Sequence, residues 1–328
     1  MYALTIGIVA STFLLSPHSR NDFPLIRAFI IVFASILLTK YFLYMILAPW
    51  SDVAVALQHR RFGARPYTPL VSVIILAWNE EVGIVQTVRT ILQSTYRNVE
   101  VIVVNDGSTD NSDRIMREFV AKHERVSAHA GGQKINLKYF YKENGGKGRA
   151  LNYGLAQAQG DIVISIDADC ALTPETIGNF VTCFRDPKVM AAVGNVKIGS
   201  TRSLIGTVQH LEFLFSFYFK KAESLLNTIY IIGGAAGAFR REVLERLNGY
   251  DSSNITEDIE LSVRIQKAGM KIVYASEAIV YTEGASTITG LMKQRLRWKR
   301  GRFQTFRQHR DLFFSLSRSH NKWLTCLM

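Results

Sequence analysis

A regular alternation of apolar runs and helical stretches begins at Leu70 and restricts the fold more than any other feature. Near-continuous runs rich in Val and Ile predict strands, and amphipathic stretches between them predict helices. The strands are expected at 70–77, 99–105, 137–141 and 161–166, and the helices near 80–94, 110–122 and 147–158. Strands that are apolar on both faces and separated by helices belong to parallel sheets built from βαβ units. The fold class is therefore α/β, with a mostly parallel, Rossmann-like sheet.

Polar residues follow three of these strands. Glu80, Asp106 and the pair Asp167 and Asp169 all stand where strands end, and ligands of parallel sheets bind beyond those carboxyl ends. The two-residue spacing turns Asp167 and Asp169 to one side, where like charges are costly unless a cation or a proton shares them. A divalent ion bridging to phosphate oxygens would relieve that cost. A strand-end turn that is simply rich in aspartate is the alternative.

Two familiar motifs are excluded by single positions. Residues 106–110 resemble the start of a calcium-binding EF-hand loop, but Asn111 stands where that loop needs glycine. Residues 144–149 resemble a phosphate-binding P-loop, but Gly148 follows Lys147 where that motif needs Ser or Thr. What remains is a glycine-rich loop with cations, suited to an anion, or else a plain solvated loop.

The amino-terminal residues are apolar. Residues 1–16 and 25–50 each form an apolar stretch, and a membrane-spanning helix needs roughly 20 such residues. We expect two transmembrane helices within residues 1–50, with a cleaved signal peptide as the alternative for the first. The basic segment 58–65 lies within an expected linker, 51–69, and positive charge marks the cytoplasmic side. The main domain, 70–290, is therefore predicted to be cytoplasmic, on a multi-pass protein of the cell membrane.

Positive charge is concentrated near the carboxyl end. Of the net charge of +12, residues 293–310 supply eight Lys and Arg and no acid, so the rest of the chain carries only +4. Aromatic residues interleave with these cations, which predicts a membrane-interface segment over 291–322. The aromatic stretch 211–221 ends in two lysines, as an interfacial helix does, although an ordinary core helix would look the same. Residues 323–328 begin another apolar run, the start of a further membrane helix or a frayed tail.

Acidic residues open a helical stretch at 256–260. Thr256 reads as an N-cap, with the acids in the first turn where the helix dipole favours them. Helix capping alone explains these acids. A carboxylate at a helix start that faces a cleft would equally serve as a general base toward a hydroxyl group.

Taken in order, the motifs resemble those of the processive family 2 glycosyltransferases, the membrane synthases of poly-N-acetylglucosamine, chitin, hyaluronan and cellulose. The resemblance spans residues 66–310. It rests on Asn79-Glu80, Asp106-Gly107-Ser108, Lys147 with Ala150-Leu151-Asn152, Asp167-x-Asp169, Thr256-Glu257-Asp258 and Gln294-x-x-Arg297-Trp298. It implies a GT-A fold, a UDP-sugar donor, a divalent cation, either Mg²⁺ or Mn²⁺, and inversion at the anomeric carbon.

The resemblance also implies a role for each matching residue. The nucleotide sugar would be bound by Glu80, Asp106, Lys147, Asp167, Asp169 and Arg297, and the metal by Asp167 and Asp169. Asp258 would be the catalytic base, and Trp298, Gln294, Glu257 and Gly234 would contact the acceptor. One departure is Asn105, which stands where the family commonly has a second acid before Asp106-Gly107.

The expected function is a membrane-bound inverting glycosyltransferase that polymerises a UDP-sugar, foremost UDP-N-acetylglucosamine, into a β-linked extracellular polysaccharide. Its expected partners are the donor, the growing polysaccharide, the lipid bilayer and export or accessory membrane proteins, with no nucleic acid. One alternative is a non-processive transferase that adds a sugar to a lipid or oligosaccharide. The other is a catalytically silent nucleotide-sugar-binding membrane subunit.

Overall fold

The computed structural model describes residues 24–63, 66–129 and 135–313, together with residues 315, 317 and 320. The chain divides into two compact units, Met1–Tyr44 and Met45–Met328. In the first unit, all described residues belong to helix α2, Pro24–Phe62, which continues into the second unit. One helix among the described residues is long and apolar enough to cross a membrane, Phe29–Phe62, with a mean hydropathy of 2.1. The apolar stretch 1–16 and the run 323–328 lie outside the described residues.

Helix α2 extends further than the sequence analysis expected. Residues 51–62 were predicted as the first part of a linker, but they are helical as far as Phe62. The last turn carries His59, Arg60 and Arg61, and positive charge is favourable at the carboxyl end of the helix dipole. The basic residues therefore end a helix.

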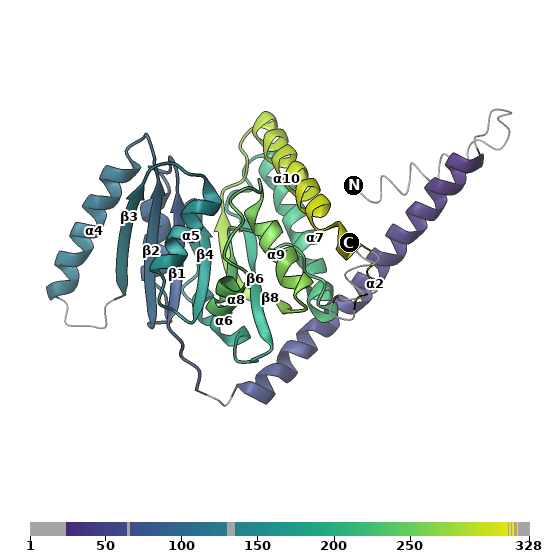
Figure 1. Ribbon diagram of the computed structural model, residues 1–328, viewed down its shortest axis with the longest axis horizontal. Coiled ribbons are helices and arrows are strands. Elements are labelled where there is room, and N and C mark those ends of the chain that lie inside the picture. The colour runs from purple at the N-terminus through teal and green to yellow at the C-terminus, as the bar shows by residue number, and fades with distance from the viewer. Residues whose placement is uncertain are drawn as a thin grey trace. The chain divides into compact units, whose positions relative to one another are not determined.

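A single eight-stranded sheet organises the second unit (Figure 1). Its strands are β1 Val71–Ala77, β2 Val99–Asp106, β3 Asn136–Lys142, β4 Ile162–Asp167, β5 Cys170–Leu172, β6 Val189–Ile198, β7 Gly237–Arg240 and β8 Lys271–Thr282. The spatial order is β3-β2-β1-β4-β7-β6-β8-β5. Strands β3, β2, β1 and β4 pair in parallel, and so do β6 and β8, whereas β7 and β5 run antiparallel to their neighbours. The predicted α/β fold with a mostly parallel sheet is confirmed.

Helices cover both faces of this sheet. They are α3 Ile84–Leu92, α4 Ser112–His129, α5 Lys147–Gln157, α6 Thr176–Cys183, α7 Leu204–Leu226, α8 Arg241–Arg246, α9 Glu257–Lys267 and α10 Ile288–Gln308, followed by the short 3-10 helix Arg310–Leu312. Helices α3, α4 and α6 pack against one face and α5, α8 and α9 against the other.

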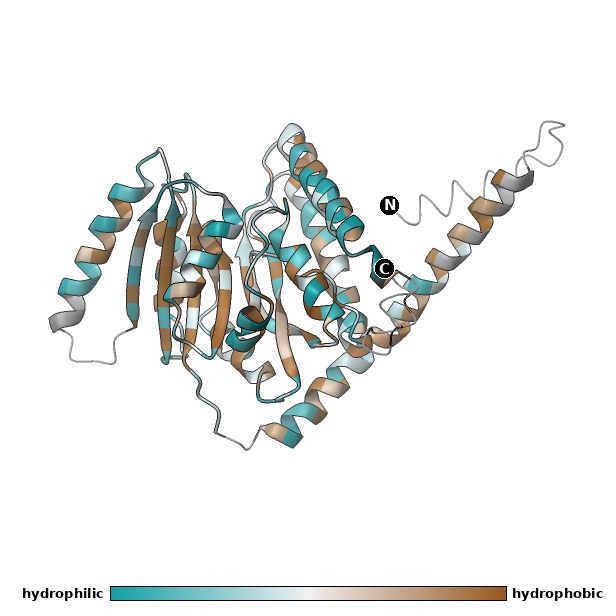
Figure 2. Ribbon diagram, in the orientation of Figure 1, coloured by the Kyte–Doolittle hydropathy of each residue, from teal (hydrophilic) through white to brown (hydrophobic). Residues whose placement is uncertain are grey.

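Alternation along the central strands supplies both hydrophobic cores. In β1, Val73 and Ile75 face the core beneath α3, whereas Ile74 faces the core beneath α5. All three are fully buried, and Figure 2 shows the hydrophobic colour along these inner strands. Burial on both faces at about 25 cal/mol per Å² makes this sheet the main stabilising element of the unit. It holds the loops after β1, β2 and β4 side by side.

Candidate active site

The loops after β1 and β2 are locked together by short polar side chains. Asn79 adopts a left-handed backbone with φ of 57°, and its Oδ1 accepts the Thr109 N–H at 2.8 Å. The Asn79 N–H donates to Ser108 Oγ at 2.9 Å, and the Glu80 N–H donates to Ser112 Oγ at 2.9 Å. Glu80 therefore stands at a fixed point beside the end of β4.

Three carboxylates crowd this edge of the sheet. Burial, and then the negative charges of Asp169 and Asp167, together raise the pKa of Glu80 to about 7. Burial and then Asp167 also raise the pKa of Asp169. Glu80, Asp167 and Asp169 therefore repel one another at the ends of β1 and β4. Glu283, which follows β8, adds to the same repulsion.

Asp106 shapes the glycine-rich loop that precedes α5. Its carboxylate accepts Lys142 Nζ at 2.5 Å and the N–H groups of Gly145 and Gly146 at 3.0 and 2.8 Å. Gly146 has φ of +87°, a conformation that favours glycine. These donors already occupy both carboxylate oxygens, so a nucleotide contact by Asp106 stays a prediction.

Lys147, the first residue of α5, joins the end of β4 to the start of α9. Its Nζ lies 2.7 Å from Asp167 Oδ1 and 3.5 Å from Glu257 Oε1. Burial opposes its charge, but Asp167, Glu257 and Asp258 together outweigh burial and raise the pKa of Lys147. One ammonium group thus forms ion pairs with two acidic motifs that lie far apart in the sequence.

Asp258 is oriented by backbone donors. Its Oδ2 accepts the Gly234 N–H at 2.9 Å, and its Oδ1 accepts the Ile259 N–H at 2.8 Å. A Cβ on Gly234 would lie 2.7 Å from Lys147 Nζ, so a side chain there would displace this ammonium group. Asp258 is half-buried, whereas its neighbour Glu257 is buried.

Ser262 ties α9 to the loop that carries Gly234. Its hydroxyl donates to the Asp258 carbonyl at 2.6 Å and accepts the Ile232 N–H at 2.9 Å. Ser262 was not predicted from the sequence, since a serine inside a helix gives no signal of such a role. Glu283 was also missed, although its place after a strand could have marked it.

Thr256 was predicted to cap α9, and this prediction is right in its position but wrong in its hydrogen bond. Thr256 occupies the N-cap position, but its side chain makes no capping hydrogen bond. The residue is buried against α10 instead, and a Cβ on Gly301 would overlap the Thr256 side chain. The start of α9 is therefore held by helix packing.

Helix α10 carries Gln294, Arg297 and Trp298 on the turns before Gly301. In the part of the chain that the structure describes, neither Gln294 nor Arg297 has a hydrogen bond or ion pair to the acidic residues of the site, and Arg297 is exposed. The Arg295 guanidinium lies over the Trp298 ring at 4.3 Å from its centroid. One face of the ring that was predicted to stack on a sugar is thus covered.

Sequence comparison decides the family. The sequence model described as "Glycosyltransferase like family 2" matches residues 68–301. The chain belongs to glycosyltransferase family 2. It is 31% identical over 234 residues to a poly-beta-1,6-N-acetyl-D-glucosamine synthase of Staphylococcus epidermidis and 29% identical over 233 residues to one of Staphylococcus aureus strain COL. Each match covers 70% of this chain and 54% of the relative, so the chain spans about half the length of these relatives.

Structural comparison agrees with the GT-A-like fold. The mannosyltransferase PcManGT of Pyrobaculum calidifontis, solved with GDP-Man and Mn²⁺, superposes with a TM-score of 0.61 at 25% identity, covering 82% of this chain and 75% of that one. GalNAc-T7, solved with UDP, GalNAc and Mn²⁺, has a TM-score of 0.50 at 17% identity, covering 66% of this chain and 43% of that one. The second likeness concerns the fold alone. Among the described residues no group of three His, Cys, Asp or Glu is arranged to hold a metal ion by itself.

Proposed function

We propose that this enzyme is a membrane-bound inverting glycosyltransferase that polymerises N-acetylglucosamine from UDP-N-acetylglucosamine into a β-linked polysaccharide. The observation that carries the proposal is the oriented, half-buried Asp258 carboxylate beside Lys147 and Asp167. The relatives named poly-beta-1,6-N-acetyl-D-glucosamine synthase support the choice of sugar and of polymer. Because this chain spans about half the length of these relatives, we assign their complete activity to it as part of the proposal.

Asp258 would act as the general base. The two N–H groups from Gly234 and Ile259 fix the direction of its carboxylate, and a fixed carboxylate can take the proton of an attacking hydroxyl group. Glu257 is less suited, since it is buried and shares Lys147. Lys147 would contact the anionic donor, Glu80 and Asp106 would complete the nucleotide site, and Gly234 would leave room for the sugar.

The acidic residues at the end of β4 fit a divalent cation. Asp167 and Asp169 offer the carboxylate oxygens that Mg²⁺ and Mn²⁺ prefer, and such ions commonly use one or two carboxylates together with substrate phosphates. Burial and then repulsion by Asp167 raise the pKa of Asp169, and a cation between the two side chains would relieve this repulsion. When bound, the ion would neutralise charge on the departing diphosphate. Arg297 would add to this neutralisation only if α10 brings it closer to the acidic residues.

Lipid contact is supported by two exposed apolar helix faces in the second unit. In α7, Leu214 and Phe215 are 59% and 61% exposed. In α10, Met292 and Phe303 are 66% and 71% exposed among the cations of that helix. Large exposed apolar surfaces rimmed by positive charge are typical of membrane-interface helices. With α2 as a spanning helix, these faces support the proposal that the catalytic unit lies at the membrane surface, on the cytoplasmic side predicted from the basic residues.

A donor panel tests the proposal. Membranes that carry the chain are incubated with UDP-N-acetylglucosamine, UDP-glucose or GDP-mannose, and products are separated by size and analysed for linkage. We expect a high-molecular-mass β-linked product from UDP-N-acetylglucosamine alone, and none from membranes with Asp258→Asn. A single sugar attached to lipid or oligosaccharide would contradict polymerisation and favour the non-processive alternative. Incorporation from GDP-mannose would contradict the proposed donor.

A further inference from the structure

One buried carboxylate in α9 takes no part in the proposed chemistry. Glu260 is 1% exposed and lies just beyond Glu257 and Asp258. Its two oxygens each accept Arg264 Nε at 2.8 Å, and Oε1 also lies 3.0 Å from His309 Nε2. Burying an ionised carboxylate is costly unless strong donors surround it. The donors to Glu260 come from Arg264 in α9 and from His309 at the end of α10, so this residue connects two helices.

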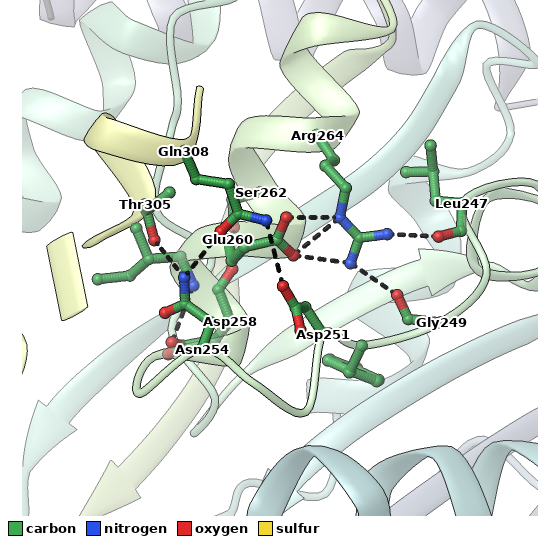
Figure 3. Close-up of polar contacts among 12 residues, drawn as sticks. Leu247, Gly249, Asp251, Asn254, Asp258, Glu260, Ser262, Arg264, Thr305 and Gln308 are labelled. Atoms are coloured by element: carbon green, nitrogen blue, oxygen red, sulfur yellow. Dashed lines mark hydrogen bonds and ion pairs between the residues drawn. The ribbon is translucent and has the colours of Figure 1, made fainter. Parts of the chain in front are cut away.

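Through Arg264, Glu260 reaches the turn before the acidic motif. Arg264 Nη2 donates to the Gly249 carbonyl at 2.7 Å, and Nη1 donates to the Leu247 carbonyl (Figure 3). The next residue, Tyr250, is held by the Asn152 side chain, which pairs with its N–H and its carbonyl at 2.8 Å each. The backbone is therefore fixed where it enters the segment 251–256, which leads to Glu257 and Asp258.

Through His309, Glu260 reaches the carboxyl end of α10. The same helix is bound to the segment 251–256 at several further points, through Gln304 and Gln308 among others. Asn254 Nδ2 donates to Thr305 Oγ1 at 3.1 Å (Figure 3), and Thr256 packs against Gly301. Helix α10 thus packs on the segment that leads to the proposed base, and the buried Glu260 contacts α10 through His309 and the turn before this segment through Arg264.

We propose that Glu260 is a positioning residue that sets α10, with Arg297 and Trp298, relative to Asp258. This inference rests on the proposed function and on the predicted substrate contacts of Arg297 and Trp298. Arg297 lies about twelve residues before His309, which is about 18 Å along a helix. A tilt of about 5° at the His309 end would move Arg297 by about 1.5 Å, and a misplacement of about 1 Å can cost about 10²-fold in rate.

A purely structural role is the competing account, and a matched variant separates the two. Glu100 is likewise buried, with its side chain 4% exposed, and accepts Ser72 Oγ at 2.6 Å, Lys138 Nζ at 2.8 Å and the Gln159 N–H at 2.6 Å. It lies near the start of β2, at the opposite end of the strands from the site. Glu100→Gln should therefore lower stability without moving α10.

The experiment compares Glu260→Gln and Glu100→Gln in full-length chains by melting temperature, UDP affinity, and kcat and KM for the acceptor. We expect both variants to melt earlier than the parent. Only Glu260→Gln should lose about 10-fold or more in kcat for transfer, with UDP affinity within about threefold of the parent. Equal kinetic losses in the two variants, or parental transfer by Glu260→Gln, would overturn the proposal.

A second pair of variants covers the outcome in which Glu260→Gln does not fold. His309→Ala removes the contact between Glu260 and α10 but keeps the contact between Glu260 and Arg264. His309→Gln places an amide N–H near the position of the ring Nε2. Transfer should fall in His309→Ala and recover in His309→Gln, and equal rates in the two would refute the positioning role. The parent and Asp258→Asn are measured alongside, because a parent without glycosyl transfer, or an active Asp258→Asn, contradicts the proposed function and not the role of Glu260.

Discussion

Replacing Asp258 by asparagine removes the proposed base while keeping the size of the side chain. The amide oxygen can still accept one of the two N–H groups, from Gly234 or from Ile259, but its NH₂ group then faces the other donor. One charge-assisted hydrogen bond is lost, which costs about 1.5–3 kcal/mol of stability. The fold should survive this change.

The effect on rate should be larger than the effect on stability. Loss of a general base typically costs about 10²–10⁴-fold, which corresponds to about 3–5.5 kcal/mol in the activation barrier. UDP affinity should change little, since Lys147 and Asp167 remain in place. The assay is the initial rate of transfer from a radiolabelled UDP-sugar, with UDP affinity and the melting temperature measured on the same preparation.

Ser262→Ala is the matched control for loosening of the glycine loop. Its hydroxyl holds Ile232 and the Asp258 carbonyl, so the loss of two neutral hydrogen bonds costs about 1–3 kcal/mol of stability. The carboxylate itself stays, and transfer should fall only a few-fold. If Asp258→Asn keeps transfer within a few-fold of Ser262→Ala, the role of Asp258 as base is refuted and its carboxylate only anchors the loop of Gly234.

Three further predictions concern other parts of the protein. Asp169→Asn should abolish the increase in UDP affinity that Mg²⁺ or Mn²⁺ produces, and an unchanged increase in calorimetric titrations would contradict the metal site. Burial lowers the pKa of Lys220 below its ordinary 10.5. At a pH between the lowered pKa of the folded state and 10.5, the unfolded chain therefore binds a proton that the native state lacks. The free energy of unfolding then rises with pH until about 10.5. Denaturant titrations in detergent should show the parent gaining stability over Lys220→Met between neutral pH and about pH 10, and a constant difference would contradict this linkage. A spin label at Phe303→Cys should be relaxed mainly by lipid-soluble oxygen in anionic bilayers, whereas one at Glu118→Cys on α4 should be relaxed by a water-soluble reagent; equal water access at both would contradict membrane contact by α10.

The first half of the sheet could be predicted from sequence because its strands are long, apolar on both faces and separated by helices. Strands β1 to β4 lie within one residue of the predicted ranges at each end. The second half gave no such signal. Strand β5 has three residues and β7 has four, and β8 pairs with β6 through register shifts. Short or irregular strands are stabilised mainly by tertiary packing, so their local sequence shows little of the alternation that predicts a strand.

The site was predicted as a set of residues but not as a geometry. The acidic cluster follows from strand ends, which any parallel sheet brings together. The partnership of Lys147 with Glu257 and the packing of Thr256 on Gly301 connect segments far apart in the chain, and local patterns contain no information about such contacts. Helix α7 shows why the aromatic stretch was ambiguous, since Lys220 is buried while Phe215 is exposed on the same helix.

The stereochemistry of the new linkage tests the central claim most directly. The sugar of UDP-N-acetylglucosamine is α-linked to the diphosphate, and attack by a hydroxyl group activated by Asp258 from the opposite face gives a β-linkage. The product formed by membranes carrying this chain can be digested to small oligosaccharides, and its anomeric protons measured by NMR. We expect every linkage made from the labelled donor to be β. An α-linked product would show retention, and would contradict direct displacement with Asp258 as the base.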